Sequence, residues 1–172
     1  AVFPELSKAD AEDSQNVVSK LVNDSLTYGG LIVIPGLFGS VILGERLLRV
    51  YGPEFTEGAT VLWVLVLASL LYGYQKQLMN ALNAIDRPDI AFRINLSFIV
   101  ANVVLNVVLI YALGYVGAAI ATAMSAGFGL VLSFFALRSL LSFSVPRGEI
   151  ARQFLTAGLM AGIVIAGLRA FE

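Results

Sequence analysis

The stretch from residue 90 to residue 112 reads IAFRINLSFIVANVVLNVVLIYA, and it carries one charged side chain, Arg93. At 1.5 Å of rise per residue, a helix of this length spans a hydrocarbon layer about 30 Å thick. Lipid offers the backbone no hydrogen-bond partner, so a span must be a helix or part of a closed barrel, and these runs lack the period-two alternation of a barrel. Similar apolar stretches occupy residues 26–44, 58–79, 115–137 and 150–171. The sequence therefore predicts an all-α polytopic membrane protein with five transmembrane helices.

The composition of the chain agrees with this class and argues against several functions. Hydrophobic residues make up 58% of the chain and charged residues 13%, whereas an average soluble domain has about 25% charged residues. The chain has no Cys and no His, so it lacks a thiol nucleophile, the usual neutral-pH proton shuttle and the commonest metal ligand. We expect no enzymatic activity, no cofactor and no metal site. The net charge of -1 argues against a nucleic-acid partner, which would need a clustered basic face.

The N-terminal segment, residues 1–25, is polar and mixed in charge. Within it Val17, Val18, Leu21 and Val22 recur at helical spacing. This pattern predicts an amphipathic helix on the cytoplasmic surface. A solvated helical extension of the first span is the alternative.

Charge and hydropathy divide the rest of the chain into two parts. Residues 26–137 contain four spans and form a four-helix transmembrane part, and residues 138–172 contain a cytoplasmic link and the fifth transmembrane helix. Phe3 and Pro4 read as the exit from an earlier span, so we expect the chain to belong to a larger protein.

Lys and Arg are distributed unequally between the two sides of the predicted spans. If the N-terminus is cytoplasmic, eight of the eleven basic residues lie inside, and Arg46, Arg49 and Arg169 lie outside. Cytoplasmic segments of membrane proteins carry an excess of Lys and Arg. We therefore expect a multi-pass protein of the cell membrane with a cytoplasmic N-terminus.

The first span contains Pro35 and Gly36 near its centre. Proline removes one backbone hydrogen bond and kinks a helix, and glycine lets a kink flex. A hinge is one interpretation. A static kink is the other, because proline is tolerated in membrane helices.

Three amides of the third span, Asn95, Asn102 and Asn106, are seven and four residues apart and so share one face of a helix. A polar side chain in hydrocarbon is costly without a partner, so this face should look into the bundle or a wet cavity. Hydrogen bonding between helices is one interpretation, and contact with a polar cargo is the other.

Basic side chains gather at the cytoplasmic ends of the second and third spans. Lys76, Arg87 and Arg93 would form a vestibule that holds a phosphate, because cations and amide donors suit a phosphorylated headgroup. The amides expected beside them are Gln75, Gln77, Asn80 and Asn83. The alternative is that Lys76 and Arg93 only reach toward the lipid headgroups.

Small residues recur every four positions in the fourth and fifth spans, and inside a bilayer they mark places where helix backbones touch. We expect each helix to pack closely on a neighbour, and the fourth to pack on two. A sliding gate surface is the alternative. The residues are Gly114, Gly117, Ala118, Ala121 and Gly129 in the fourth span and Gly158 and Gly162 in the fifth.

Short motifs along residues 3–137 carry a family resemblance. The most specific is GYVGAAIAT at residues 114–122, preceded by the spaced asparagines. The weaker ones are Phe3-Pro4-Glu5-Leu6-Ser7, Pro35, Arg49-Val50-Tyr51-Gly52, Asn80-Ala81-Leu82-Asn83-Ala84, Arg87-Pro88 and Arg93-Ile94-Asn95. Together they resemble the second half of the polysaccharide flippases in the multidrug, oligosaccharidyl-lipid and polysaccharide exporter superfamily.

The resemblance implies a transporter with two pseudo-symmetric helical lobes around a cavity that opens alternately to each side. It implies that the cargo is the glycan headgroup of a polyprenyl-linked carrier. The partners would then be membrane lipid, the polyprenyl-linked glycan and the N-terminal lobe of the same transporter. Because of their shared helix face, we assign Arg93, Asn95, Asn102 and Asn106 to the wall of the cleft.

Two other functions stay open from the sequence. A multidrug or cation antiporter of the same fold would need acidic ion sites, and no carboxylate lies in the middle of any predicted span. A structural membrane subunit is the second alternative.

Overall fold

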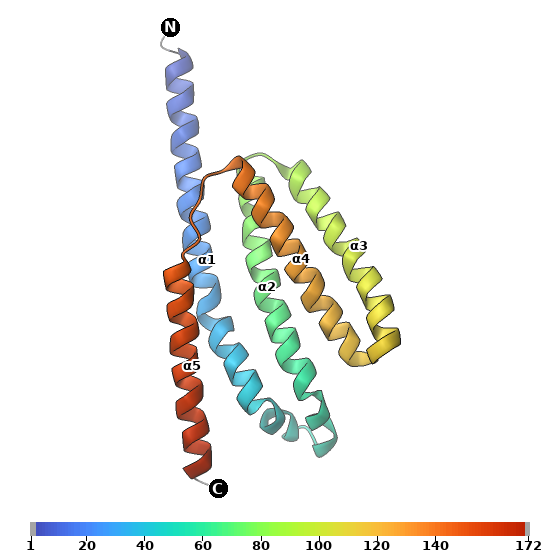
Figure 1. Cartoon of the computed structure of the whole chain (residues 1–172). Coiled ribbons are helices and arrows are strands. Elements are labelled where there is room, and N and C mark those ends of the chain that lie inside the picture. The colour runs from blue at the N-terminus through green and yellow to red at the C-terminus, as the bar shows by residue number, and fades with distance from the viewer. Residues whose placement is uncertain (1–2, 171–172) are drawn as a thin grey trace.

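The computed structural model contains only helices and their connections over the residues that it describes, which are residues 3–170 for the backbone and 16–170 for the side chains. In chain order these are α1 (Phe3–Arg49), the short 3₁₀ helix η1 (Pro53–Gly58), α2 (Ala59–Ala84), α3 (Pro88–Leu113), α4 (Tyr115–Leu140) and α5 (Arg147–Ala170) (Figure 1). Five segments are long and apolar enough to cross a membrane. The predicted all-α class and the five membrane-length helices are confirmed.

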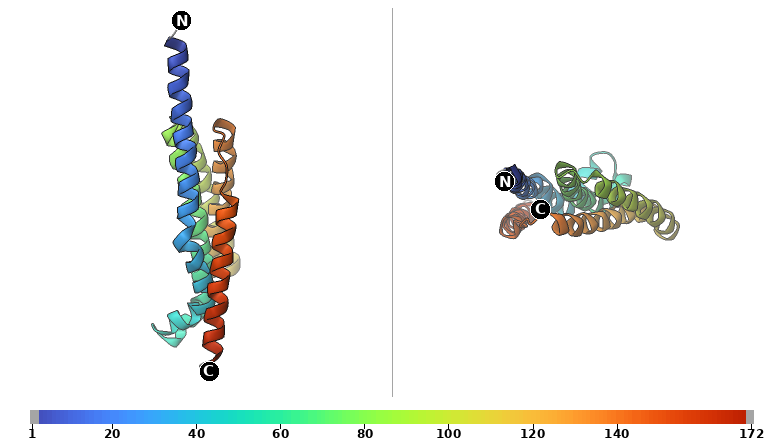
Figure 2. Two further views of the ribbon diagram at one scale, coloured as in Figure 1. Left: turned by 90° about the vertical axis from the view of Figure 1, so that its left-hand side faces the viewer. Right: turned by 90° about the horizontal axis from the view of Figure 1, so that it is seen from above.

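α1 is one continuous helix of 47 residues, about 70 Å long at 1.5 Å per residue. It runs unbroken through residue 25, where the separate amphipathic helix was expected to end. The continuous helix favours the alternative of a helical extension of the first span, because no Gly or Pro interrupts the chain between Ser7 and Tyr28, and a cytoplasmic amphipathic segment over residues 1–25 stays a prediction. Figures 1 and 2 show the N-terminal part of α1 standing clear of the other helices.

α1 changes direction between its blue and cyan sections in Figure 1. Pro35 lies inside this helix and has no N–H to donate to the helical ladder. Gly36 beside it is exposed, and a β-carbon there would meet no atom within 4 Å. The two residues thus lie in a section of α1 with free space on one side.

α4 lies at the centre of the bundle, where it packs against both α2 and α3. α1 packs on α2, and α5 packs on α1, whereas the backbones of α4 and α5 make no close approach. Seen along the helices, α4 and α5 lie on the same side of α1 and α2 (Figure 2). One core cluster includes Leu78, Leu82 and Leu137, and a second joins Ile34 to Ala157.

The connections between α2, α3 and α4 are short and have left-handed residues. Gly114 alone separates α3 from α4, with φ of 61°, and its N–H donates to the Ile110 carbonyl at 2.8 Å. In the α2–α3 turn Asp86 has φ of 58°, and the Arg87 N–H donates to the Leu82 carbonyl at 2.9 Å. Because both connections are so short, α3 lies antiparallel to α2 and α4 lies antiparallel to α3.

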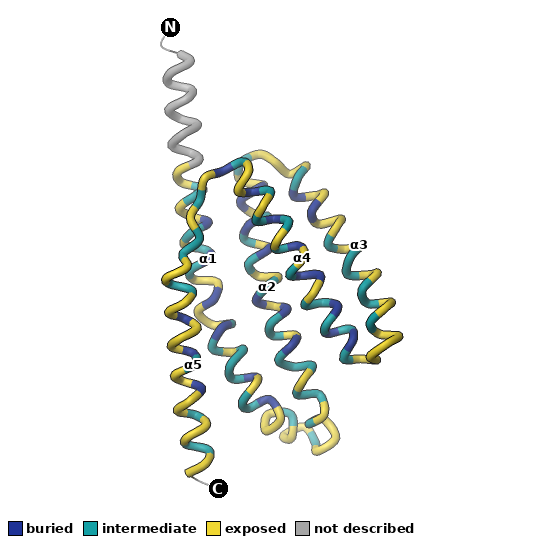
Figure 3. The backbone as a smooth tube through the Cα atoms, in the orientation of Figure 1, coloured by how far each residue is buried: buried dark blue, intermediate teal, exposed yellow. Residues whose placement is uncertain are grey.

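Burial follows the inward faces of the helices. Figure 3 shows buried residues along α1, α2 and α4, whereas most of α3 and α5 is exposed. The buried residues of α3 are Ala91 and Ile94, both in its first two turns. In a membrane such exposed helices contact lipid or other helices.

Candidate functional site

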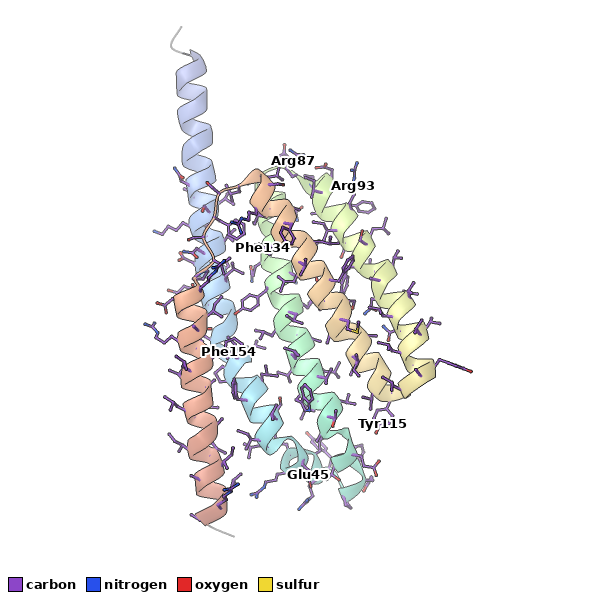
Figure 4. All side chains as sticks on the ribbon, in the orientation of Figure 1. Glu45, Arg87, Arg93, Tyr115, Phe134 and Phe154 are labelled. Carbon is purple, nitrogen blue, oxygen red and sulfur yellow. The ribbon has the colours of Figure 1, made fainter. Side chains whose placement is uncertain are left out.

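One end of the bundle, called the basic end below, contains the α2–α3 turn and the α4–α5 link. Figure 4 shows Arg87 and Arg93 at this end and Glu45 at the other. The described Lys and Arg residues of the helix halves and connections that lead to the basic end are Lys20, Lys76, Arg87, Arg93, Arg138, Arg147 and Arg152, although α5, which carries the last two, begins further along the bundle (Figure 1). Those at the opposite end are Arg46, Arg49 and Arg169. The two ends of the bundle therefore differ clearly in basic charge.

The exposed face of α2 is polar over the half nearer the basic end. The opposite face of this helix is buried against α1 and α4 through Ala68, Leu78 and Leu82. On the exposed face, side chains at every third or fourth position point away from these contacts. We call these exposed residues the α2 polar face, and they are Ser69, Tyr72, Gly73, Lys76, Asn80 and Asn83.

The exposed faces of the neighbouring helices are apolar by contrast. From residue 99 onward, α3 exposes Val100, Val103, Val104 and other aliphatic side chains. α4 exposes Met124, Phe128, Val131 and Phe135 within its span. These faces suit lipid, whereas polar side chains in a span almost always face a bundle interior or a water-filled cavity. The α2 polar face is therefore the best candidate for a wet surface in the described part of the chain.

Lys76 lies in the α2 polar face, eight residues before the end of the helix, or about 12 Å along its axis. Arg87 in the α2–α3 turn has its Nε 3.6 Å from an Asp89 carboxylate oxygen, with both side chains about half exposed. Such a pair contributes little stability. Lys76 and Arg93 have no carboxylate partner among the described residues, and both are exposed. All three cations are thus accessible from solvent or headgroups.

The amides expected beside these cations are divided between two environments. Gln75 is buried, and its amide lies against Gly129 of α4, so it does not belong to a vestibule. The reason is its position on α2, one residue and so about 100° around the helix from Lys76, on the side that packs against α4. Gln77 and Asn80 line a groove of about 150 Å³ between α1 and α2. Asn83 is exposed near the end of α2.

The three asparagines of α3 do not share one environment. The Asn102 amide donates to Ser125 Oγ of α4 at 2.8 Å, and the Asn106 amide donates to the Asn102 carbonyl at 2.8 Å. Asn102 therefore bonds across the α3–α4 contact, and Asn106 bonds to Asn102 within α3. Asn95 is exposed and accepts or donates no side-chain hydrogen bond within the described residues. A helix face that the sequence groups together is split because α4 covers only part of α3.

The small residues of α4 lie where its neighbours approach. Gly117, Ala121 and Gly129 are buried, and Ala118 is half-buried. A β-carbon at Gly117 would overlap the Leu109 carbonyl of α3. Gly114 is exposed in the turn.

The small residues named for α5 are placed differently. Gly162 is exposed with no atom near its absent β-carbon, and Gly158 is half-buried with Phe38 at 4.0 Å. The buried face of α5 is instead Gln153, Ala157 and Ala161. Its i, i+4 spacing was visible in the sequence, but Gln153 is not a small residue and so was not grouped with the others.

A polar contact between α1, α2 and α5 was not predicted. The Gln153 amide of α5 donates to the Thr27 carbonyl of α1 at 2.7 Å, beside a T-shaped contact of Phe154 with Phe38 (Figure 4). Tyr74 Oη of α2 and Gln153 Oε1 both approach the place where a β-carbon of Gly30 would lie. A β-carbon at position 30 would displace the ends of the Tyr74 and Gln153 side chains, so glycine at this position leaves room for the contact of α5 with α1.

The comparisons with known proteins identify the family. The family model described as "Lipid II flippase MurJ" matches residues 1–172. The chain belongs to this family. The resemblance to lipid-linked glycan flippases drawn from the sequence is therefore confirmed, and the five spans make this member of the family a multi-pass membrane protein.

Two curated relatives of Haloferax volcanii are similar over most of the chain. One, named "Probable flippase AglR", is 39% identical over 167 residues. The other, named "Probable low-salt glycan biosynthesis flippase Agl15", is 31% identical over 164 residues. Each alignment covers 95% of this chain and 35% of the relative, so the chain spans about a third of the length of these family members.

A solved structure shares the fold. It is named "Lipid II flippase MurJ, inward closed conformation", with a TM-score of 0.76 and 19% sequence identity. The match covers 90% of this chain and 36% of that one. The helical arrangement is thus that of a segment of the MurJ fold.

Proposed function

We propose that the chain forms the C-terminal portion of a flippase that moves lipid-linked oligosaccharide or polysaccharide precursors across the cytoplasmic membrane by alternating access. The names of the two curated relatives support a glycan cargo. Their greater length supports further helices, including an N-terminal lobe, as the partner that closes the cavity. The protein acts as a transporter and catalyses no covalent step.

The observation that carries the proposal is the α2 polar face. A glycan headgroup cannot cross hydrocarbon unaided, because each unsatisfied polar group costs several kcal/mol. A surface of hydroxyl, amide and ammonium groups replaces the lost hydrogen bonds while the lipid tail stays in the bilayer. The α2 polar face offers these groups over about 21 Å, from Ser69 to Asn83 at 1.5 Å per residue.

The cations on and near this face have different tasks. Lys76 lies deepest and contacts the phosphate of the carrier after it enters the cavity. Arg87 and Arg93 lie at the basic end and attract that phosphate before entry. Asn95, exposed on α3, contributes a further hydrogen-bonding group, whereas Asn102 joins α3 to Ser125 of α4 and Asn106 bonds to Asn102 within α3.

We propose that the basic end faces the cytoplasm. By the order of the spans, seven described basic residues belong to the helix halves and connections on this side and three to those on the other, which is the bias expected of a cytoplasmic side. The N-terminus is then cytoplasmic, and the carrier enters from the inner leaflet. Pro35 and Gly36 lie in the section of α1 that has free space on one side. There the bend of α1 would change when the cavity switches from one side of the membrane to the other.

Replacement of one lysine tests the cargo path. Lys76→Gln in the transporter that contains this chain should slow export of lipid-linked glycan by about tenfold to a hundredfold, because a hydrogen bond to a charged group is worth about 1.5 to 3 kcal/mol. Lys20→Gln is the matched control, since Lys20 is exposed on the α1 extension away from the α2 polar face. Export is measured at equal membrane abundance. Parental export by the Lys76→Gln variant would remove this face from the cargo path.

A further inference from the structure

Tyr72 is the one aromatic residue of the α2 polar face. Ser69 precedes it by three residues and Lys76 follows it by four, so the three side chains are neighbours on one side of the helix. Tyr72 is 47% exposed. Its hydroxyl forms no hydrogen bond within residues 16–170. Tyr72 is therefore accessible to a ligand that approaches the α2 polar face.

Phe98 of α3 supports the Tyr72 ring. The centres of the two rings lie 5.8 Å apart, and their planes are inclined by 35°, an arrangement in the range of favourable aromatic pairs. α2 and α3 both pack on α4 and approach each other little, so this pair is a contact between two helices that are otherwise mostly apart. The Tyr72 ring therefore has a fixed orientation at the border of the α2 polar face with α3.

The backbone beside the Tyr72 ring is open. Gly73 is exposed, and a β-carbon there would meet no atom within 4 Å. It follows Ser69 by four residues and precedes Lys76 by three, so it lies between them on the same face. A glycine lets a ligand approach the backbone closely. The α2 polar face is thus open next to an aromatic ring, a hydroxyl and an ammonium group.

The depth of Tyr72 does not fit a role as a membrane anchor. Tyrosines of membrane proteins gather at the two interfaces with water. α2 runs from Ala59 to Ala84, so Tyr72 lies 13 residues from its start and 12 from its end, about 18 Å along the axis. A hydroxyl at this depth needs a polar partner, which lipid does not supply.

These features together suit a sugar ring. A pyranose has a face of C–H groups, which packs on an aromatic ring, and a rim of hydroxyls, which needs hydrogen-bond partners. Ligand sites commonly combine aromatic walls with a few polar groups. The β-carbons of Tyr72 and Lys76, four residues apart, are separated by about 5 to 6 Å. This spacing is close to the distance between a phosphate and the ring of the sugar joined to it.

We propose that Tyr72 stacks on the first sugar of the glycan, the one joined to the carrier phosphate, while Lys76 binds that phosphate. This inference rests on the proposed function and names the residue of the same site that recognises the sugar. Ser69 Oγ donates to the Leu65 carbonyl at 2.8 Å and can still accept a hydrogen bond from a sugar hydroxyl. Tyr72 thus distinguishes the glycosylated carrier from bare polyprenyl phosphate.

Native mass spectrometry of the transporter that contains this chain tests the proposal with two lipids, polyprenyl phosphate and the same lipid carrying one glucose on its phosphate. The parent should retain the glucosylated lipid about fivefold to tenfold better, the size of effect expected of one aromatic contact. Tyr72→Leu should abolish this preference without changing retention of bare polyprenyl phosphate. Tyr72→Phe keeps the ring and should retain most of the preference. Lys76→Gln should lower retention of both lipids by the same factor, because both carry the phosphate.

A second variant tests the open space with Tyr72 intact. Gly73→Leu fills that space and should also abolish the preference, and it does not disturb the fold because its β-carbon meets no atom. Tyr111→Leu is the matched control, since Tyr111 is exposed on α3, 13 residues beyond Phe98 or about 20 Å along the helix, and should keep the preference.

The outcomes separate this proposal from the proposed function. Retention that needs Lys76 but gains nothing from glucose would overturn the role of Tyr72 and leave the proposed function standing. A glucose preference that survives Tyr72→Leu or Gly73→Leu would overturn that role as well. Retention of neither lipid by the parent would overturn both.

Discussion

Gly117 is the residue on which the α3–α4 hairpin depends. It lies three residues after the left-handed Gly114, where the backbone of α4 first meets the last turns of α3. A β-carbon at this position would overlap the carbonyl of Leu109, which is backbone and cannot turn aside. The two helices approach this closely only because residue 117 has no side chain.

Gly117→Ala should therefore destabilise the protein by about 1 to 3 kcal/mol, the usual cost of overpacking a tight contact. Thermal unfolding in detergent measures the loss. Gly127→Ala is the matched control on the same helix, because its β-carbon would lie an ordinary 3.8 Å from Leu71 Cδ1. The control should be neutral or slightly more stable, since Ala favours helix over Gly. Equal stability of both variants would contradict the close approach.

The residue scale also shows what the sequence could not decide. Asn102 and Asn95 have nearly the same angular position on a helix, yet Asn102 bonds to Ser125 and Asn95 is exposed. The difference comes from α4, which crosses α3 and covers only part of its length. Gln75 and Lys76 are adjacent in sequence, and the burial of Gln75 depends on Gly129, 54 positions later. The helical period predicts on which face of a helix a residue lies, but it does not predict which other helix covers that face.

At the scale of elements, the length and hydropathy of the apolar stretches were enough to predict the five membrane-spanning helices. All five spans are helices because the backbone of about 20 consecutive apolar residues can satisfy its hydrogen bonds in lipid only by forming a helix. The alternative left open at α1 concerns polar residues with no Gly or Pro among them, where composition does not say whether a helix continues or a new helix begins. Its first span and N-terminal extension form one helix of 47 residues.

The bend in α1 gives a measurable prediction. Pro35→Ala restores the backbone donor at the only proline inside α1 beyond its first turn, and should straighten the helix. Spin labels at Lys20 and Leu47, both exposed, would then approach the separation of about 40 Å that 27 residues of straight helix span. In the parent the separation should be shorter.

Gly36→Ala is the control for this measurement. A β-carbon at Gly36 meets no atom within 4 Å, so the substitution should leave the label separation unchanged. If Pro35→Ala also leaves it unchanged, the bend belongs to the packing of α1 on α2 and α5 rather than to the proline.

At the scale of the whole molecule, the exposed surface of the five helices is of two kinds, one apolar and one polar. α3, α4 and α5 expose aliphatic and aromatic side chains along their spans, and α2 exposes hydroxyls, amides and Lys76. A structure of this shape is stable in a bilayer only if the α2 polar face is kept from lipid by water or by further helices of the transporter.

Cysteine labelling distinguishes the two kinds of surface, because the natural chain has no Cys. Gly73→Cys and Asn80→Cys lie on the α2 polar face, and Val104→Cys lies on the apolar face of α3. A charged, membrane-impermeant thiol reagent should modify the first two at least about tenfold faster, since it needs water and a thiolate. Asp89→Cys at the basic end and Glu54→Cys in η1 calibrate the two sides, and in intact cells only the latter should react. Slow reaction of Gly73→Cys and Asn80→Cys from both sides would mean that α2 faces protein or lipid instead of an aqueous cavity.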